Sequence, residues 1–488
     1  MARKKQKKKS LDELLKEALV PKKEWPYEVP ENWVWVRFGY VADWQKGKKP
    51  KVLKEENKGG FIPYVTIGGF ERGVIEYYAD EKSTNAICDK DDILMVWDGA
   101  RAGLVGIGAK GAVGSTLAII KLNQINNKYL FYFLRSKYDY INANHRGTGI
   151  PHVDPNILKE MQLPLPPLAE QKRIVDKLEF LFGKINKAKE LIEEARETFE
   201  KRRAAILAKA FKGELTAKWR EEHPVGESAE ILLSNIERHK AILSKKRKSN
   251  IKHLDEVDPP YELPEGWVWA KLGQLSFYIT SGSRNWAKYY STSGALFIRT
   301  QNINTNRLVL DNVVYVKLPE NVEGKRSLVE QYDILTTITG ANVGKCALVN
   351  EAIPEAYVSQ SVALIKLVDK SIAKYIYLSM LSPEAGGGEL TSLAYGIGRP
   401  VLSLENIRNI HIPLAPIEEQ NEIVNIVEDL LNKEEETLNM IELDETIQML
   451  EKSILAKAFR GELGTNNSDE ESAIELLKNV LQEKFNLN

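Results

Sequence analysis

Apolar and polar positions follow a helical period through residues 167–212. Apolar side chains recur there at steps of three and four residues, with Lys and Glu between them and only Arg202 interrupting the series. A mean spacing of about 3.5 residues over this length predicts a helix that packs along a partner helix, in preference to one amphipathic helix on a globular body. The predicted seam is Ile174, Leu178, Leu181, Ile185, Ala188, Ile192, Ala195, Phe199 and Ile206.

A second apolar stripe, at residues 416–460, supplies the partner helix. Its period slips around Lys433–Glu436, so this seam is less regular. Each stripe follows a Pro-rich run and ends at a glycine, Gly213 or Gly461, as helix starts and C-caps commonly do. Two helices of about 40 residues would each span roughly 60 Å. The second predicted seam is Ile423, Val427, Leu430, Met440, Leu443, Ile447, Leu450 and Ile454.

The segments before the two stripes have a different pattern. Residues 31–163 and 263–412 contain short apolar runs separated by clusters of Gly, Asn and Asp. This pattern is typical of a compact mixed domain with many turns. In the first segment, the runs predicted to be strands are Trp33–Phe38, Phe61–Ile67, Ile93–Trp97 and Thr116–Leu122.

The second half of the chain repeats the motifs of the first half in the same order. The shared motifs are a Pro-Glu-x-Trp entry, an Asp-Ile-Leu segment with a following Gly-Ala, a Gly-x-Gly-x-Pro loop, a Pro-Leu-x-Pro-x-x-Glu-Gln run and a Leu-Ala-Lys-Ala-Phe-x-Gly-Glu-Leu end. Chance does not produce so many ordered matches, so the chain is two copies of one module. The motifs stand at 30–33 and 264–267, 92–100 and 333–341, 147–151 and 396–400, 164–171 and 413–420, and 207–215 and 455–463.

The duplication predicts an α+β fold. Two similar mixed αβ domains are separated by two long antiparallel helices that form a coiled coil, with an internal pseudo-twofold repeat. Paired amphipathic segments at 227–233 and 471–477 follow the long helices, and a helix at 11–20 is expected to pack near the C-terminus. The predicted parts are a basic tail and N-terminal helix (1–30), the first domain (31–163), the first spacer helix (164–216), a short helix and linker (217–262), the second domain (263–412), the second spacer helix (413–463) and a C-terminal short helix (464–488).

The charge balance, the cysteine count and the lack of long apolar runs exclude several classes of protein. The 488 residues carry 68 Lys and Arg against 68 Asp and Glu, which excludes a protein that coats nucleic acid by bulk charge. Two cysteines, Cys88 and Cys346, are too few for a disulfide framework or a Cys-rich zinc site. No apolar run approaches the length of a membrane span, and no apolar segment of a secretory signal follows the basic N-terminal run. The expected location is a reducing cytoplasm.

Two motifs match catalytic signatures. Asp258-Pro259-Pro260-Tyr261 matches the motif with which amino-methyltransferases hold a flipped base, but it lies in a polar stretch before the second domain. Gly106-x-Gly108-x-x-Gly111 matches a dinucleotide fingerprint, but a β-type run follows it where a helix is required. We interpret the first as a linker and the second as a β-hairpin. The six histidines never stand at metal-ligand spacing, so neither a catalytic constellation nor a metal site is expected.

Together and in this order, the duplicated motifs resemble the specificity subunit of type I restriction–modification systems over nearly the whole chain. The resemblance implies that each mixed domain is a target recognition domain for one half of a bipartite double-stranded DNA sequence. It implies that the coiled coil sets the gap and docks two modification (methyltransferase) subunits. It also implies separate restriction (endonuclease and translocase) subunits, with S-adenosylmethionine, ATP and Mg in the partners and no cofactor or catalytic activity in this chain.

The loops differ most between the two domains, as expected if each reads a different half-site. Arg and Lys suit guanine edges or phosphates, and Asn and Gln suit adenine; a solvated charge or a turn-capping amide is the alternative for each residue. The pairs Trp33/Trp35 and Trp267/Trp269 are expected in the core, because alternate strand positions share one face. The candidate DNA-binding residues are Lys46, Lys48, Lys49, Arg72, Arg101, Arg146, Arg284, Asn285, Gln301, Asn342, Lys345 and Arg399.

Two other functions remain open from the residues alone. A solitary adenine methyltransferase would use Asp258-Pro259-Pro260-Tyr261 and would itself bind S-adenosylmethionine. A protein-binding scaffold would use the coiled coil as a spacer and would show no preference for a bipartite duplex.

Overall fold

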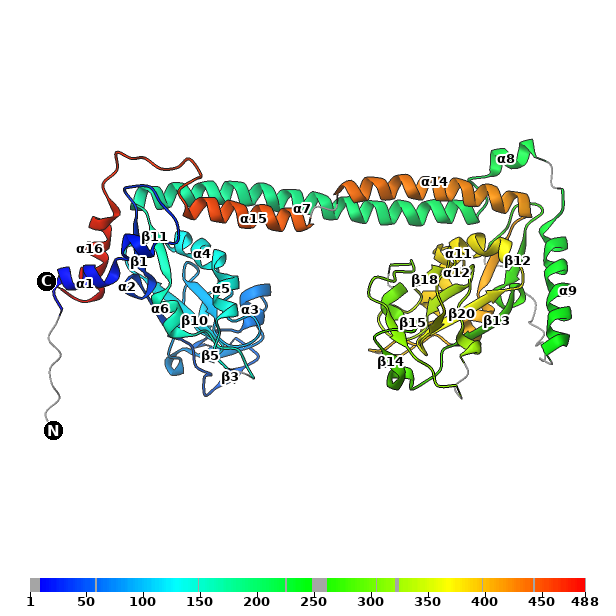
Figure 1. The fold of residues 1–488 in the computed structure, drawn as a ribbon, viewed down its shortest axis with the longest axis horizontal. Helices are drawn as coiled ribbons and strands as arrows, with labels where there is room; N and C mark the ends of the chain where they lie inside the picture. Colours follow the sequence, from blue (N-terminus) through cyan, green and yellow to red (C-terminus); the bar gives the residue numbers. More distant parts are fainter. Residues whose placement is uncertain are drawn as a thin grey trace. The chain divides into compact units, whose positions relative to one another are not determined.

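The computed structural model describes residues 9–57, 59–147, 149–223, 226–247, 261–303, 305–320, 324–396, 398–441 and 444–487 (Figure 1). The chain divides into two compact units: unit 1 consists of residues 1–191 with 443–488, and unit 2 consists of residues 192–442. Each unit contains one mixed αβ domain. The fold class predicted from the sequence is confirmed, since two mixed domains are present with a long helix between them in the chain.

Three sheets form the mixed domain of unit 1. A two-stranded sheet pairs β1 (Val34–Arg37) with β11 (Gln162–Leu165), the first and last strands of the domain. The other strands are β2 (Ala42–Lys46), β3 (Leu53–Lys54), β4 (Phe61–Val65), β5 (Tyr78–Asp80), β6 (Ile87–Cys88), β7 (Ile93–Val96), β8 (Val105–Gly106), β9 (Gly111–Val113) and β10 (Leu117–Leu122). They form an antiparallel sheet in the order β2-β10-β7-β8 and a five-stranded sheet in the order β3-β5-β4-β9-β6, in which β4 and β9 are parallel. Four consecutive residues of β10 are buried, so both faces of the β2-β10-β7-β8 sheet are covered.

The helices of unit 1 come from both ends of its chain. They are α1 (Leu11–Ala18), α2 (Phe38–Val41), α3 (Ile67–Arg72), α4 (Asn127–Ser136), α5 (Tyr138–Ala143), α6 (Pro155–Glu160), α15 (Asp444–Phe459) and α16 (Ala473–Lys484), with short turns η1 (Lys22–Glu24) and η2 (Glu81–Ser83). A capping box between Ser10 and Glu13 starts α1. This helix packs against α16, and Lys484 donates to the carbonyls of Gly39 and Ala42. The predicted packing of the N-terminal helix near the C-terminus is therefore confirmed.

Unit 2 repeats this arrangement with differences in its third sheet. Its strands are β12 (Val268–Lys271), β13 (Ser276–Ser281), β14 (Tyr290–Ser291), β15 (Ala295–Ile298), β16 (Val314–Val316), β17 (Ile334–Thr337), β18 (Cys346–Leu348), β19 (Ala356–Val358), β20 (Val362–Leu367) and β21 (His411–Leu414). The sheets have the orders β12-β21, β13-β20-β17-β18 and β14-β16-β15-β19, with β15 parallel to β19. The helices are α8 (Ala217–Glu222), α9 (Ala229–Arg247), α10 (Leu272–Leu275), α11 (Ala373–Leu381), α12 (Gly386–Ser392), α13 (Leu404–Asn409) and α14 (Ile417–Ile441), with turns η3 (Trp286–Tyr289), η4 (Thr300–Ile303), η5 (Lys325–Ser327) and η6 (Lys370–Ile372).

One helix, α7 (Leu168–Phe211), belongs to both units, and each unit pairs its share of α7 with another helix. In unit 1 the partner is α15, since Lys189 Nζ lies 2.7 Å from Glu451 Oε1. In unit 2 the partner is α14, and Phe199 of α7 and Leu431 of α14 line one cavity. The helix α14 continues through Lys433–Glu436, where the period slips.

The predicted seam residues are buried near the start of α7, near the start of α14 and on α15. Ile423 and Val427 belong to the same apolar cluster as Tyr375 and Ile412, so this part of the stripe completes the core of unit 2. The sheltered seam residues are Ile174, Leu178, Ile185, Ile423, Val427, Ile447 and Ile454, which are buried, and Leu181, Ile192, Ala195, Phe199, Ile206 and Leu430, which are partly buried.

Two predicted seam positions are not sheltered in this way. Ala188 is exposed, and Leu450 is 48% exposed, so the assignment of these residues to the buried seam was wrong. The buried face of α15 continues from Ile454 to Leu455 and Phe459, toward α4, and leaves Leu450 outside it. Leu443 and the side chain of Met440 lie outside the described part of the structure.

Two local predictions also differ from the structure. The segment Gly106–Gly111 is not a β-hairpin, because β8 pairs with β7 whereas β9 pairs with β4 and β6, so the chain crosses there from one sheet to another. The segment predicted at 227–233 extends to Arg247 as α9, which is longer than its counterpart α16. Among the described residues, no helix is both long and apolar enough to cross a membrane.

Candidate nucleic-acid interface

The last strand of each domain is joined to the domain by an equivalent tyrosine. In unit 1 the Tyr129 hydroxyl donates to the Pro164 carbonyl at 2.7 Å, and in unit 2 the Tyr375 hydroxyl donates to the Pro413 carbonyl at 2.5 Å. Both phenols are buried, and burial raises the pKa of each far above its ordinary value. Each phenol therefore acts as a fixed donor to the Pro-rich run that starts a long helix.

A buried glutamate joins the two long helices in unit 2. Glu419, in the first turn of α14, accepts from Thr216 Oγ1 at 2.6 Å and from Trp267 Nε1 at 2.8 Å, and it forms an ion pair with Arg220. Thr216 follows the end of α7, and Trp267 belongs to the domain entry. One carboxylate thus connects a helix start, a helix end and the domain.

The equivalent glutamate of unit 1 has a different set of partners. Glu170 accepts from Thr465 Oγ1 at 2.7 Å, and Arg173 Nη2 lies 2.6 Å from Glu170 Oε2. Arg173 also pairs with Glu470 at 2.7 Å, and this contact holds the pKa of the Glu470 carboxyl below its usual value. Trp33 Nε1 is buried and has no hydrogen-bond partner among the described residues. The indole contact of unit 2 is therefore missing from unit 1.

Both long helical segments end at a glycine that touches the domain entry. Gly213 and Gly461 each have φ of 74°, a backbone conformation that favours glycine. A Cβ at either position would lie 2.5 Å from a proline ring carbon, Pro264 Cγ for Gly213 and Pro30 Cγ for Gly461. The repeated helix-end and domain-entry motifs are therefore explained by packing.

Two loops in each unit form a shared backbone arrangement, which we call the frame. Loop A consists of residues 98–104 in unit 1 and 339–345 in unit 2. Loop B consists of residues 146–152 in unit 1 and 395–401 in unit 2. Residues 148 and 397 of loop B lie outside the described residues. In unit 1, Gly99 N donates to the Pro151 carbonyl at 2.8 Å, and Arg146 and His152 exchange two backbone hydrogen bonds of 2.8 and 2.9 Å.

The frame of unit 2 has the same hydrogen bonds. Gly340 N donates to the Pro400 carbonyl at 3.0 Å, and Tyr395 and Val401 exchange two backbone hydrogen bonds of 3.0 and 2.8 Å. Loop A has φ of 106° at Gly99 and 101° at Gly340. The two frames are therefore alike in backbone, and their side chains can be compared position by position.

Ion pairs cross-link the frame of unit 1. Lys46 Nζ, at the end of β2, lies 2.7 Å from Asp98 Oδ2, and His152 Nδ1 lies 2.7 Å from Asp98 Oδ1. Arg146 Nε lies 2.7 Å from Asp154 Oδ2, and this contact holds the pKa of the Asp154 carboxyl below its usual value. The frame therefore brings the predicted residues Lys46 and Arg146 together, each with a carboxylate.

Of the other four predicted residues of unit 1, Arg101 and Arg72 lie on or beside the frame, and Lys48 and Lys49 follow β2. Arg101 of loop A forms an ion pair with Glu71, whose chain neighbour is Arg72 at the end of α3. Lys48 and Lys49 follow β2 and are exposed. Four of the six candidates thus lie in the frame or beside it, and two continue from Lys46 along the chain.

The frame of unit 2 carries mostly neutral side chains. Ser281 of β13 stands at the position of Lys46 of β2. Ser281 pairs with Ala363 of β20, and Lys46 pairs with Ala118, the equivalent alanine of β10. Thr339 and Val401 take the places of Asp98 and His152, and Ser403, which caps α13, takes the place of Asp154.

Loops A and B of unit 2 bring three of its predicted residues together. Asn342 and Lys345 lie on loop A, where Lys345 N donates to the Asn342 carbonyl at 3.1 Å. Arg399 is exposed on loop B, at the position of Ile150 in unit 1. Tyr395 is 60% exposed at the position of Arg146, and sequence reasoning missed it.

The remaining predicted residues of unit 2 lie outside both loops. Arg284 and Asn285 follow β13 and are exposed, and Asn285 has a φ of 63°. Gln301 lies on η4, after β15. Alignment of the two Gly-x-Gly-x-Pro motifs would have identified Tyr395 and Ile150, because both stand at fixed offsets from these glycines.

The catalytic-looking motif ends at a residue with a packing role. Asp258, Pro259 and Pro260 lie outside the described residues. The hydroxyl of Tyr261 donates to the Phe211 carbonyl at 2.9 Å, and its ring packs edge-on against Trp269. Of the four tryptophans expected in the core, Trp33, Trp35 and Trp267 are buried and Trp269 is partly buried. Among the described residues, no cluster of His, Cys, Asp and Glu could hold a metal ion.

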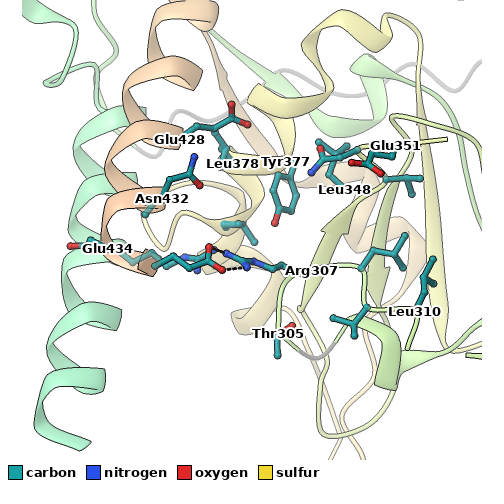
Figure 2. Close-up of a pocket in the computed structure, with 18 of the residues that line it drawn as sticks. Thr305, Arg307, Leu310, Leu348, Glu351, Tyr377, Leu378, Glu428, Asn432 and Glu434 are labelled. Atoms are coloured by element: carbon teal, nitrogen blue, oxygen red, sulfur yellow. Dashed lines mark hydrogen bonds and ion pairs between the residues drawn. The ribbon is translucent and has the colours of Figure 1, made fainter. Parts of the chain in front are cut away.

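A cavity of about 890 Å³ lies between the mixed domain and the long helices of unit 2 (Figure 2). Arg307 reaches across it and forms an ion pair with Glu435 of α14, as the dashed lines in Figure 2 show. This contact holds the pKa of the Glu435 carboxyl below its usual value. Tyr377 and Leu378 of α11 form another part of the wall. The arrangement indicates that the cavity belongs to the attachment of the domain to its helices.

Comparison with known proteins agrees with this architecture. The model of the type I restriction modification DNA specificity domain matches residues 30–196 and 264–443. The type I restriction enzyme MjaVIII specificity subunit of Methanocaldococcus jannaschii is 27% identical over 457 residues, which cover 90% of this chain and 95% of the relative. The EcoBI specificity subunit of Escherichia coli is 26% identical over 93% of each chain.

A solved structure has the same fold. It is described as the structural basis of complex assembly and conformational transition of the type I R-M system, and one of its chains has a TM-score of 0.59 at 21% identity. The match covers 90% of this chain and 100% of that chain. This chain therefore belongs to the family defined by the type I restriction modification DNA specificity domain.

Proposed function

We propose that this chain is the DNA-reading subunit of a type I restriction–modification complex and that each recognition domain reads one half of a bipartite target. The observation that carries this proposal is the pair of frames, in which the same backbone hydrogen bonds present different polar side chains. Base edges differ in their donors and acceptors, so a shared scaffold with different side chains suits two different half-sites. The family membership supports the same assignment.

In this proposal the long helices set the gap between the half-sites and dock two modification subunits. The helix α7 has residues in both units, so a change in its length would change the gap. The chain itself is non-catalytic. The modification subunits carry S-adenosylmethionine, and separate restriction subunits use ATP and Mg. The complex acts in the cytoplasm, where it meets its DNA.

The test is a map of methylated adenines in cells that carry this chain with its methyltransferase partner. The expected result is one bipartite motif with a fixed gap. An insertion of four residues near Glu193 in α7 adds about 6 Å, close to two base-pair steps of about 3.4 Å. It is expected to change the gap and to leave both half-sites intact. Altered half-sites with an unchanged gap would contradict the proposal.

A matched insertion controls for added chain length. Four residues placed after the exposed Gly226, between α8 and α9, are expected to leave both the gap and the half-sites unchanged.

The rival functions make different predictions for the purified chain. Binding of S-adenosylmethionine by the chain alone would favour a solitary methyltransferase, and equal retention of target and scrambled duplexes would favour a protein scaffold.

A further inference from the structure

We infer that the two frames read DNA with different kinds of residue: in unit 2 the exposed Arg399 and Tyr395 contact bases directly, whereas in unit 1 Asp98 is a positioning residue that holds Lys46 for its contact with DNA. The inference rests on the proposed function, because it names the side chains with which each frame determines its half-site.

Loop B of unit 2 offers two large polar side chains on a loop that is hydrogen-bonded near both of its ends. Backbone hydrogen bonds hold the loop at Tyr395 before Arg399 and at Pro400 and Val401 after it. Tyr395 is 60% exposed and Arg399 is exposed, and no ion pair among the described residues involves Arg399. A guanidinium can make two hydrogen bonds to a guanine edge, and a phenol can pack against or hydrogen-bond a neighbouring base.

The same positions of unit 1 present a different chemistry. Ile150, in place of Arg399, is apolar and 62% exposed, and Arg146, in place of Tyr395, is paired with Asp154. On loop A, Asp98 pairs with Lys46, and the Asp98 side chain is only 16% exposed.

Asp98 limits where the Lys46 ammonium can go. The same carboxylate also binds His152, so its own orientation is fixed from two sides. A lysine on a flexible stem loses positional freedom when its ammonium is held 2.7 Å from such an anchor. The paired carboxylate also offsets part of the lysine charge, so the contact adds less to the salt dependence of binding than a free lysine would.

The experiment uses the full chain in complex with its methyltransferase partner and selects bound duplexes from a library randomised in both half-sites. Arg399→Ala is expected to reduce the preference at one base pair of the second half-site by roughly 5- to 150-fold, the range for one bidentate base contact. The first half-site is expected to stay unchanged. Lys218→Ala, an exposed cation on α8 of the same unit, is the matched control and is expected to change neither half-site.

The variant Asp98→Asn tests the positioning role. It frees Lys46, so the preference at one base pair of the first half-site is expected to fall while the second half-site is unchanged. The freed lysine can pair with a phosphate, which would steepen the slope of log affinity against log salt by roughly 0.9. Lys46→Met is expected to relax the same base pair without steepening the slope. This variant also keeps the test decisive if Asp98→Asn does not fold.

The outcomes separate this inference from the proposed function. If the unmodified complex selects no bipartite sequence, the proposed function itself fails. If the complex selects one and Arg399→Ala leaves every preference in the second half-site intact, direct reading by Arg399 is overturned. If Asp98→Asn and Lys46→Met leave the first half-site unchanged, the positioning role of Asp98 is overturned. A substitution of Ile150→Arg that adds a base preference in the first half-site alone would support the equivalence of the two frames.

Discussion

Units 1 and 2 share most of the contacts that join the recognition domains to the long helices, and they differ more where their loops are exposed. Tyr129 and Tyr375 make the same hydrogen bond, and Gly213 and Gly461 have the same φ and the same close contact with a proline. The frames keep their backbone hydrogen bonds, but neutral side chains of unit 2 stand at the positions where unit 1 has its network of ion pairs. Buried contacts thus account for the repeated sequence, and exposed positions on a common backbone are where the copies diverge.

The largest effect is expected from the buried glutamates, at which the two junctions are least alike. Glu419→Ala leaves Trp267 Nε1, Thr216 Oγ1 and the Arg220 guanidinium without this acceptor, so unit 2 should lose about 3–5 kcal/mol of unfolding free energy. Glu170→Ala should destabilise unit 1 by only about 1–3 kcal/mol, because Arg173 keeps its pair with Glu470.

Hydrogen exchange of the full chain at increasing urea assigns these losses to each unit. The exposed neighbour Glu418 provides a control, and Glu418→Ala should change stability by less than about 0.5 kcal/mol. Equal losses for Glu170→Ala and Glu419→Ala would mean that Arg173–Glu470 does not compensate in unit 1.

The helix-end glycines should behave as equals. Gly213→Ala and Gly461→Ala each place a Cβ 2.5 Å from a proline ring at a φ of 74°, so each should cost roughly 1–3 kcal/mol through crowding and backbone strain. The same exchange measurement compares the two costs. A clearly smaller loss at one glycine would show that its domain entry can move away from the helix end.

The two buried tyrosines should also give matched, smaller effects. Tyr129→Phe and Tyr375→Phe each remove one hydroxyl and leave a proline carbonyl without its donor, at a cost of about 1 kcal/mol of unfolding free energy. Urea unfolding of each variant measures the cost. A difference of more than about 1 kcal/mol between them would contradict the equivalence of the two junctions.

The smallest effect is expected from the exposed ion pair between Arg307 and Glu435. The Arg307 guanidinium lowers the pKa of Glu435, so the pair stabilises the folded state above the unfolded pKa near 4.5 and loses its contribution as the pH falls through the lower folded pKa. Arg307→Ala should cost less than about 1 kcal/mol at neutral pH, because the side chains are 52% and 33% exposed.

Titration of Glu435 by NMR together with urea midpoints at neutral and acidic pH checks this pair. Arg307→Ala should return the pKa of Glu435 toward its usual value and remove the acid-dependent part of the difference. Arg307→Lys keeps the charge without the two-pronged geometry, so it should retain part of the effect. A stability difference that persists in acid would exclude the ion pair as its cause.

Much of the fold could be predicted because the repeat and the apolar period report buried contacts. The helix α7 and the burial of Ile174, Leu178, Ile423 and Val427 follow directly from the stripe. The exposure of Leu450 could not be predicted, since a period does not show which neighbour a helix face meets. The Gly106–Gly111 segment was misread for a similar reason: local β signals do not identify the partner strand.

The candidate site was predicted less completely. Basic and amide residues in the loops were chosen by type, which found Lys46, Arg146 and Arg399 but not the carboxylates beside the first two. The ion pair of Asp98 with Lys46 joins residues 52 positions apart, so only the fold reveals it, whereas Asp154 pairs with Arg146 close by in the chain. Whether the predicted residues contact bases stays a prediction.

The division of the chain has a consequence for its synthesis on the ribosome. Residues 443–488 complete unit 1, although residues 192–442, which form all of unit 2, are translated before them. Until α15 emerges, Tyr129 and Phe133 lack Phe459, whose ring packs edge-on against both at 5.4 Å. The domain translated first is thus the last to be completed, and its aromatic surface stays uncovered in the nascent chain while the later domain can already fold.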